Sequence, residues 1–225
     1  MTEPSLRLPA AVLWDMDGTL VDTEPYWLRA ETDLVRTWGG EWSPDEGLQL
    51  VGQGLESSAR IFQSRGVGLS TDEIIDTLTD RVLDQVRVAV PWRAGARELL
   101  HSIKDAGVPT ALVTMSISRM AHAIAGSLGF AGFDLVVSGD QVANPKPHPE
   151  PYLTAAQRLG VEIADCVVLE DSEPGVASGV AAGAAVVALP LHIDLPPSPA
   201  YDVRRSLEGL TLADLSALLV DRSPA

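Results

Sequence analysis

The sequence predicts an α/β fold, a Rossmann-like parallel sheet with helices on both faces, into which an α-helical domain is inserted. The first observation is the chain after residue 91, where segments with helical periodicity alternate with short apolar segments typical of strands. The second is an apolar segment at 11–14, followed by a stretch, 24–90, in which only helical patterns occur. Alternating helices and strands joined by short connections form parallel sheets covered on both faces. We therefore expect a core domain of 1–23 and 91–225 and an inserted helical domain of 24–90.

The inserted stretch carries the usual signals of helix ends. Pro25 suits the first turn of a helix, and Gly39-Gly40 would end that helix. A further helix is expected over about 55–63. Two capping boxes, in which a Ser is followed three residues later by a Glu, begin two other helices: Ser43 with Glu46 and Ser70 with Glu73.

Four helix–strand pairs follow in the core. In chain order they are 95–107 with 108–114, 118–129 with 133–138, 149–160 with 166–170, and 174–183 with 184–189. The carboxyl ends of parallel strands meet at one edge of the sheet, which is where open α/β sheets bind their ligands. An insertion directly after the first strand is well placed to cover that edge.

The composition limits the partners and the setting. Acidic residues outnumber basic ones by 31 to 16, which gives a net charge of −15. Nucleic acid and anionic membranes need a positive surface, so neither is expected as the main partner. The chain has one cysteine, Cys166, so no internal disulfide can form, and its start shows no signal-peptide pattern. We expect a cytoplasmic protein, a monomer or else a dimer.

Polar side chains follow the expected strands and would meet at one edge of the sheet. They are Asp15 and Asp17 after the first strand, Thr114 after the second, Lys146 after the third, and Glu170 with Asp171 at the end of the fourth. Four acids in one crevice need a cation, and a hard divalent ion such as Mg²⁺ with oxygen ligands would satisfy them. A carboxylate nucleophile, a metal and a lysine together indicate phosphoryl transfer. The metal and Lys146 would make a cationic pocket in an acidic protein.

Four motifs, "DMDGTLVDT", "LVT" followed by "MS", "KPHPEPY" and "VVLEDSEPGVASG", resemble those of the haloacid dehalogenase superfamily. The helical insertion resembles the cap of its phosphoglycolate phosphatase and β-phosphoglucomutase-like group. The resemblance implies that Asp15 is the nucleophile and Asp17 the general acid and base. It also implies that Thr114, Met115 and Lys146 hold the phosphoryl group. The implied metal site for Mg²⁺ consists of Asp15, Asp17 through its backbone carbonyl, Glu170 and Asp171.

The expected function is Mg²⁺-dependent hydrolysis of a small phosphorylated metabolite, such as a sugar or polyol phosphate, through an aspartyl-phosphate. A sugar phosphomutase of the β-phosphoglucomutase type is the alternative. A mutase must hold a second phosphate from the cap, yet loop 50–59 has no Lys or Arg and contains the repulsive Glu56; Arg60 follows it. This favours a phosphatase.

Three other functions are disfavoured by particular residues. Dehalogenation needs neither a metal nor an acid at the position of Asp17, so the presence of Asp17, Glu170 and Asp171 argues against it. Phosphonate cleavage needs a cap lysine, and segment 24–90 has none. A non-catalytic scaffold on the same fold would be expected to lose the nucleophile or the metal acids, all of which are present.

Several further residues have two possible roles. The tryptophans Trp27, Trp38 and Trp42 either pack within the cap or face the substrate. Substrate contacts from residues 116–119 stay open. His148 is expected at the surface of its loop, and Cys166 as a small buried apolar residue.

Overall fold

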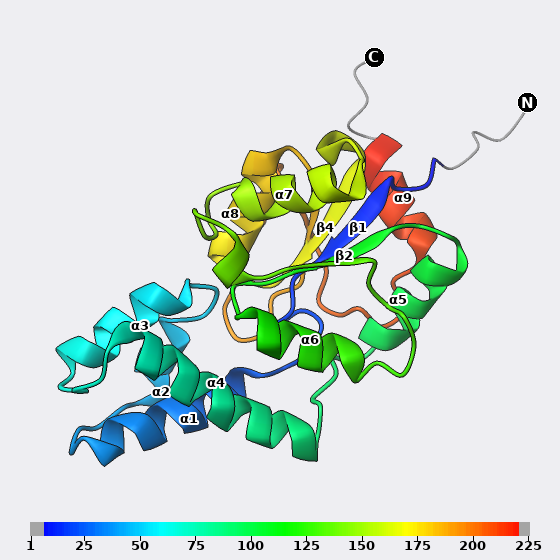
Figure 1. Cartoon of the computed structure of the whole chain (residues 1–225). Coiled ribbons are helices and arrows are strands. Elements are labelled where there is room, and N and C mark those ends of the chain that lie inside the picture. The colour runs from blue at the N-terminus through cyan, green and yellow to red at the C-terminus, as the bar shows by residue number, and fades with distance from the viewer. Residues whose placement is uncertain (1–6, 221–225) are drawn as a thin grey trace, which may run out of the picture.

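The computed structural model describes residues 7–220, and its centre is a six-stranded parallel sheet (Figure 1). The strand order is β3-β2-β1-β4-β5-β6. In chain order the strands are β1 (Ala11–Trp14), β2 (Thr110–Val113), β3 (Leu135–Val137), β4 (Cys166–Glu170), β5 (Ala185–Ala188) and β6 (Asp202–Val203). β1 lies between β2 and β4, with Leu13 in register with Ala111 and Val168. The strand that carries Asp15 and Asp17 is therefore central.

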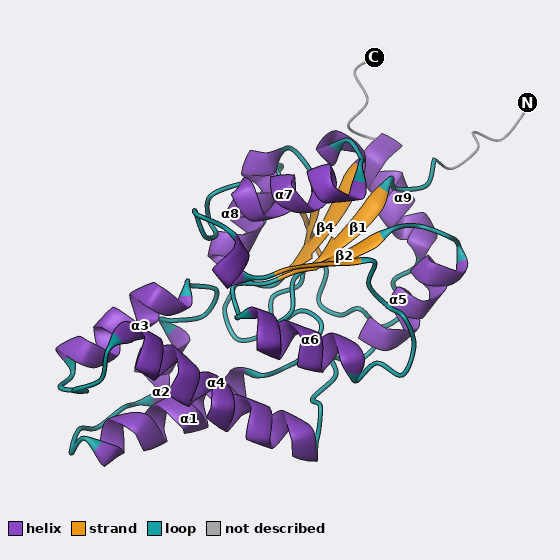
Figure 2. Ribbon diagram, in the orientation of Figure 1, coloured by secondary structure: helices purple, strands orange, loops and turns teal. Residues whose placement is uncertain are grey.

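Helices cover both faces of the sheet (Figure 2). One face packs against α5 (Ala96–Asp105), α6 (Ser118–Gly126) and α9 (Leu212–Val220), and the other against α7 (Glu150–Leu159) and α8 (Glu173–Ala182). Successive residues of β1 alternate between the two cores, with Val12 and Trp14 in one, and Ala11 and Leu13 in the other. The fold class predicted from the sequence is confirmed.

Residues 24–90 form a separate group of helices beyond the carboxyl ends of the strands (Figure 1). These are α1 (Glu24–Thr37), α2 (Pro44–Leu48), α3 (Leu55–Ser64) and α4 (Thr71–Val88), and α4 packs against both α1 and α3. We call this group the helical segment. Both capping boxes, at Ser43 and at Ser70, are formed as expected.

Two adjacent connections join the helical segment to the sheet. The backbone N–H of Asp22 donates to the Pro91 carbonyl at 2.8 Å, and that of Arg93 donates to the Leu20 carbonyl at 3.1 Å. The outgoing and returning chains thus run side by side. That 1–23 with 91–225 and 24–90 act as two domains stays a prediction.

The sequence patterns missed the last two elements. β6 has two residues and α9 has nine, and no element was predicted after residue 189. A two-residue strand at the edge of a sheet is too short to show a period. Within residues 7–220, no helix combines the length and the apolar character needed to cross a membrane.

Candidate active site

The turn after β1 places Asp15 and Asp17 at the carboxyl edge of the sheet. The N–H of Asp15 donates to the Leu169 carbonyl at 3.0 Å, which extends the pairing of β1 with β4. Gly18 then turns the chain with φ +87°, and a Cβ there would lie 1.9 Å from Asp171 Oδ2. Only glycine fits, because it accepts positive φ and leaves room for the Asp171 carboxylate.

Lys146 is buried between two carboxylates. Its Nζ lies 2.6 Å from Asp15 Oδ1 and 2.6 Å from Glu170 Oε1, and it donates to the Val113 carbonyl at 2.9 Å. Burial acts to lower the pKa of Lys146, but Asp15 and Glu170 outweigh it and raise that pKa above its usual value. The ammonium is therefore charged and held by all three of its donors.

Glu170 is saturated by protein donors. Its Oε1 accepts from Lys146 and from the Tyr152 hydroxyl at 2.7 Å, and its Oε2 accepts from the Ser172 hydroxyl at 3.1 Å. The backbone N–H groups that follow it in the chain also donate to Oε2. Gly175 allows this close packing, because a Cβ there would lie 1.9 Å from Oε1. Glu170 thus fixes the position of Lys146.

Asp15, Glu170 and Asp171 form a buried acidic cluster that fits a metal ion. Each offers an oxygen, and the three oxygens lie within 4.8 Å of one another. Asp15 Oδ2 and Asp171 Oδ2 are buried and have no hydrogen-bond partner among the described residues. Burial, and then the Glu170 charge, raise the pKa of Asp15 to about 8, and burial with the Asp15 charge raises that of Asp171. Two unpartnered buried carboxylate oxygens are an arrangement that a hard divalent cation would stabilise.

Asp17 is held by four donors from two parts of the chain. Its Oδ1 accepts from the Thr23 hydroxyl at 2.5 Å and from Trp27 Nε1 at 3.2 Å, one directly before α1 and one in its first turns. Its Oδ2 accepts from the Ser116 hydroxyl at 2.7 Å and from the Thr114 hydroxyl at 3.3 Å. The position of this carboxylate therefore depends on both the sheet edge and the helical segment.

A model of the haloacid dehalogenase-like hydrolase family matches residues 9–183, well over half of the chain. The chain belongs to this family. Hexitol phosphatase A of Escherichia coli K12 is 35% identical over 207 residues, which are 89% of this chain and 92% of the relative. Fructose-1-phosphate phosphatase YqaB of the same strain is 32% identical over 186 residues, which are 77% and 93%.

A solved relative has the same architecture. CbbY from Rhodobacter sphaeroides, in complex with phosphate, has a TM-score of 0.85 at 27% identity, and the match covers 92% of this chain and 99% of that one. Together these results confirm the resemblance to the superfamily and the expectation of an enzyme of the phosphatase kind.

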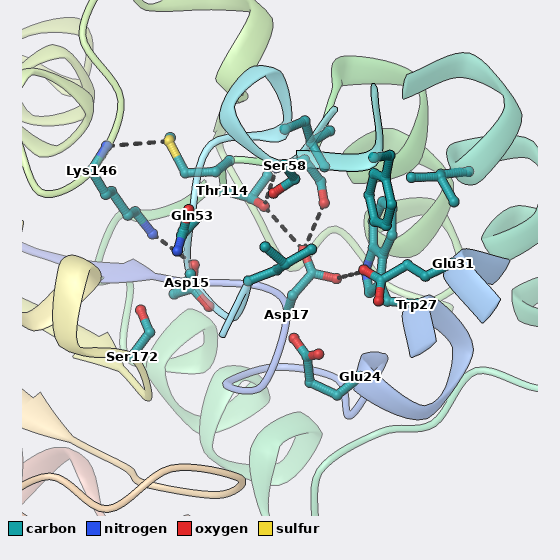
Figure 3. Close-up of a pocket in the computed structure, with 17 residues that line it drawn as sticks. Asp15, Asp17, Glu24, Trp27, Glu31, Gln53, Ser58, Thr114, Lys146 and Ser172 are labelled. Atoms are coloured by element: carbon teal, nitrogen blue, oxygen red, sulfur yellow. Dashed lines mark hydrogen bonds and ion pairs between the residues drawn. The ribbon is translucent and has the colours of Figure 1, made fainter. Parts of the chain in front are cut away.

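A pocket in this hydrolase lies between the sheet edge and the helical segment (Figure 3). The side chains that line it from the sheet edge are Asp15, Asp17, Thr114, Met115, Ser116, Lys146 and Ser172. The helical segment adds Trp27, the apolar side chains of Leu50, Leu55, Phe62 and Leu78, and the polar ones of Glu24, Glu31, Gln53 and Ser58. Lys146 is the single cation among the described lining residues. The pocket therefore has one cationic end.

Two acids of α1, Glu24 and Glu31, line the pocket from the helical segment, and no Lys or Arg among the described residues pairs with them. Burial, and then the Asp17 charge, raise the pKa of Glu24 to about 8. Burial raises the pKa of Glu31 to about 7, although a hydrogen bond from Trp42 opposes this rise. Near neutral pH both groups are thus partly protonated, in contrast to an exposed glutamate.

The structure brings the predicted site residues together, while their chemical roles stay predictions. Thr114, Met115 and Lys146 line the pocket beside Asp15 and Asp17. Thr114 Oγ1 also accepts from the Ser116 N–H at 3.0 Å, and Met115 Sδ accepts from the Lys146 N–H at 3.3 Å. Glu170 and Asp171 lie directly behind this layer.

The residues with open roles differ in whether they face the pocket. Trp27 and Ser116 line it. Trp42 packs on Phe62 within the helical segment, and Trp38 is 44% exposed. The remaining three are Arg119, which pairs with Asp76 and Asp80 of α4, His148, which is exposed, and Cys166, which is buried.

Glu24, Glu31 and Tyr152 were not predicted as site residues from the sequence. Glu24, Trp27 and Glu31 are spaced by three and four residues, so they share one face of α1. Two acids on the same helical face as a tryptophan were the signal that could have found them. Tyr152 gave no such signal, because its contact with Glu170 depends on the packing of α7 against the sheet.

Proposed function

We propose that this hydrolase is a Mg²⁺-dependent phosphatase that cleaves a small phosphate monoester through an aspartyl-phosphate on Asp15. The observation that carries the proposal is the state of the Asp15 carboxylate. One of its oxygens lies 2.6 Å from the Lys146 ammonium, and the other is buried without a hydrogen-bond partner, as is Asp171 Oδ2. A nucleophile beside a fixed cation and a cluster of acids suits an anionic phosphoryl group bound with a metal.

The proposed metal ligands are Asp15, Asp171 and the backbone carbonyl of Asp17. We place Glu170 behind them, because protein donors already occupy both of its oxygens. When bound, Mg²⁺ would neutralise the acids and polarise the phosphoryl oxygens. Lys146, the Thr114 hydroxyl and the Met115 backbone would orient those oxygens.

The proposed reaction has two steps. In the first, an Asp15 oxygen forms a bond to phosphorus, the bond from phosphorus to the ester oxygen breaks, and Asp17 gives a proton to the leaving alkoxide. In the second step, Asp17 takes a proton from a water molecule, and the oxygen of that water attacks phosphorus. The bond from phosphorus to Asp15 then breaks and inorganic phosphate leaves.

A sugar or polyol monophosphate is the proposed substrate class. The relatives named above are a hexitol phosphatase and a fructose-1-phosphate phosphatase, which supports a polyhydroxylated substrate. Among the described residues, Lys146 is also the single cation that lines the pocket, which leaves one place for a phosphate. The cytoplasmic setting and the monomeric state, with a dimer as the alternative, stay predictions.

The alternative function, a sugar phosphomutase, lacks a supporting contact. Arg60 of α3 lies 3.2 Å from Glu56 with 66% of its side chain exposed, and it does not line the pocket. Within the described part of the helical segment, no Lys or Arg faces the pocket to hold a second phosphate.

The decisive test is release of inorganic phosphate from an aryl phosphate and from a hexitol phosphate, with Mg²⁺ and after exhaustive chelation. We expect turnover that requires Mg²⁺ and returns when it is restored. Full activity after chelation would contradict the metal assignment. Phosphate migration within one sugar, stimulated by a bisphosphate, would favour the mutase.

A further inference from the structure

Glu31 is a buried acid of the helical segment, and nothing in the proposed reaction uses it. Its side chain lies on α1, and the residue is 6% exposed. Its Oε2 accepts a hydrogen bond from Trp42 Nε1 at 2.9 Å. Its Oε1 has no hydrogen bond from the described residues, and the side chain lines the pocket. One oxygen is therefore fixed and the other is available to a ligand.

The surroundings hold this carboxyl in place without neutralising it. Trp42 is itself buried and packs on Phe62, with ring centroids 4.8 Å apart. Gly47 packs beside this hydrogen bond, since a Cβ there would lie 3.2 Å from Glu31 Oε2 and 3.7 Å from Trp42 Nε1. Burying a carboxyl without a cation costs free energy, and a glutamine could accept the same bond from Trp42. Stability alone does not account for an acid at this position.

The place of Glu31 relative to the reacting groups defines what it can contact. In Figure 3, Asp17 lies between Asp15 and Glu31. An in-line attack by Asp15 sends the leaving oxygen away from Asp15 and toward the proton donor, Asp17. A carboxyl beyond Asp17 would therefore contact the carbon chain of the leaving alcohol rather than the phosphate.

The chemistry of this wall indicates a neutral, hydroxylated ligand. Glu24 and Glu31 would repel a second phosphate or a carboxylate, while a partly protonated carboxyl both donates to and accepts from hydroxyl groups. The apolar side chains of Leu50 and Phe62 complete the wall and suit the C–H faces of a polyol. We propose that Glu31 is a specificity-determining residue that binds a hydroxyl group of the leaving alcohol. This inference rests on the proposed phosphatase function and names the group that selects its substrate.

The experiment compares Glu31→Ala and Glu31→Gln with the wild type on two matched esters, a hexitol 6-phosphate and hexyl phosphate. The two substrates have the same chain length and differ in their hydroxyl groups. For Glu31→Ala we expect kcat/KM on the hexitol phosphate to fall by about 10- to 100-fold, the range of a lost hydrogen bond to a strongly polar group. On hexyl phosphate it should change by less than about twofold. Glu31→Gln should recover part of the loss, because an amide still bonds hydroxyl groups.

Glu41→Gln is the matched control, because Glu41 belongs to the same segment, is exposed and lies outside the pocket lining. An equal loss on both esters would assign Glu31 to stability and overturn the inference. So would a wild-type preference for 6-aminohexyl phosphate that Glu31→Gln abolishes, because that pattern indicates an ion pair. If no ester is cleaved, including an aryl phosphate, the proposed function itself fails.

Discussion

Two groups of acids line the pocket, one from the sheet edge and one from α1, and they differ in what compensates their charge. At the sheet edge, Asp15 and Glu170 share Lys146, and Glu170 also accepts from Tyr152. On the helical wall, Glu24 accepts no hydrogen bond from the described residues, and Glu31 accepts one, from Trp42. Both groups are shielded from water, so the contrast lies in the available cations rather than in burial alone.

The contrast assigns each wall a different part of an ester. The sheet edge combines a fixed ammonium with oxygens open to a metal, which suits a phosphoryl group that carries negative charge. The helical wall combines acids with raised pKa values and apolar side chains, which suits a neutral alcohol. A pocket with one cationic end and one acidic end selects for a single phosphate at one end of its substrate.

The largest expected effect tests the sheet-edge group. Asp15→Asn removes the proposed nucleophile, so no aspartyl-phosphate can form and turnover should fall to background. Acid-quenched mass spectrometry after mixing with an aryl phosphate checks for phosphate on the protein. Turnover near the native rate, or phosphate on a different residue, would refute the assignment of Asp15.

Asp17→Asn should have a smaller effect that depends on the leaving group. General acid–base catalysis contributes about 10² to 10⁴ in rate, and we expect at least this loss on an alkyl phosphate. An aryl phosphate needs little acid help to leave, but breakdown of the phospho-enzyme by water still needs a base. Phospho-enzyme should therefore accumulate, which the same mass measurement detects. Equal losses on both esters without accumulation would argue against a proton-transfer role.

The difference between the two walls also explains what the sequence could predict. Asp15, Asp17, Lys146, Glu170 and Asp171 follow strands, and parallel topology alone brings strand ends to one edge. Glu24 and Glu31 lie on a helix, and a helical face shows its period but not what it faces. Whether α1 turns that face toward the pocket depends on its packing against α4, a long-range contact without a local signal.

Glu31→Gln should change the dependence of stability on pH. Burial raises the pKa of Glu31 from 4.5 to about 7 in the folded chain, so the folded state binds this proton more tightly than the unfolded state. The resulting stability is complete below about pH 4.5 and is lost as the pH rises through about 7. At about 1.4 kcal/mol for each pKa unit, the rise in the pKa of Glu31 corresponds to about 3 kcal/mol of stability.

The variant lacks this titration. The free energy of unfolding of Glu31→Gln minus that of the wild type should therefore be larger at pH 8 than at pH 4.5, by up to about 3 kcal/mol. Urea unfolding at both pH values measures the difference, with Glu41→Gln as the exposed control. A difference that does not change with pH would show that Glu31 is not a buried titrating acid, and the contrast between the walls would weaken.

The smallest expected effect concerns the contact that holds the two walls together. Arg119 of α6 donates to the Asp76 carboxylate at 2.9 Å and to the Asp76 carbonyl at 3.0 Å, and it also pairs with Asp80. Asp76 and Asp80 belong to α4, so this ion pair joins the helical segment to the core. We predict that the segment moves as a unit about its two connections, near 22–25 and 88–91, and that Arg119 favours the closed arrangement.

Arg119→Gln should then raise KM by a few-fold at low ionic strength, because a partly exposed ion pair contributes about 0.2–1 kcal/mol. It should leave the chemical step unchanged, since Arg119 does not line the pocket. The difference from the wild type should shrink at high ionic strength, where salt screens the wild-type pair as well. Arg87→Gln is the matched control, because Arg87 pairs with Asp84 within α4 at 2.6 Å. A KM for Arg119→Gln that equals that of the control at every ionic strength would show that the Arg119 ion pair does not hold the helical segment against the core.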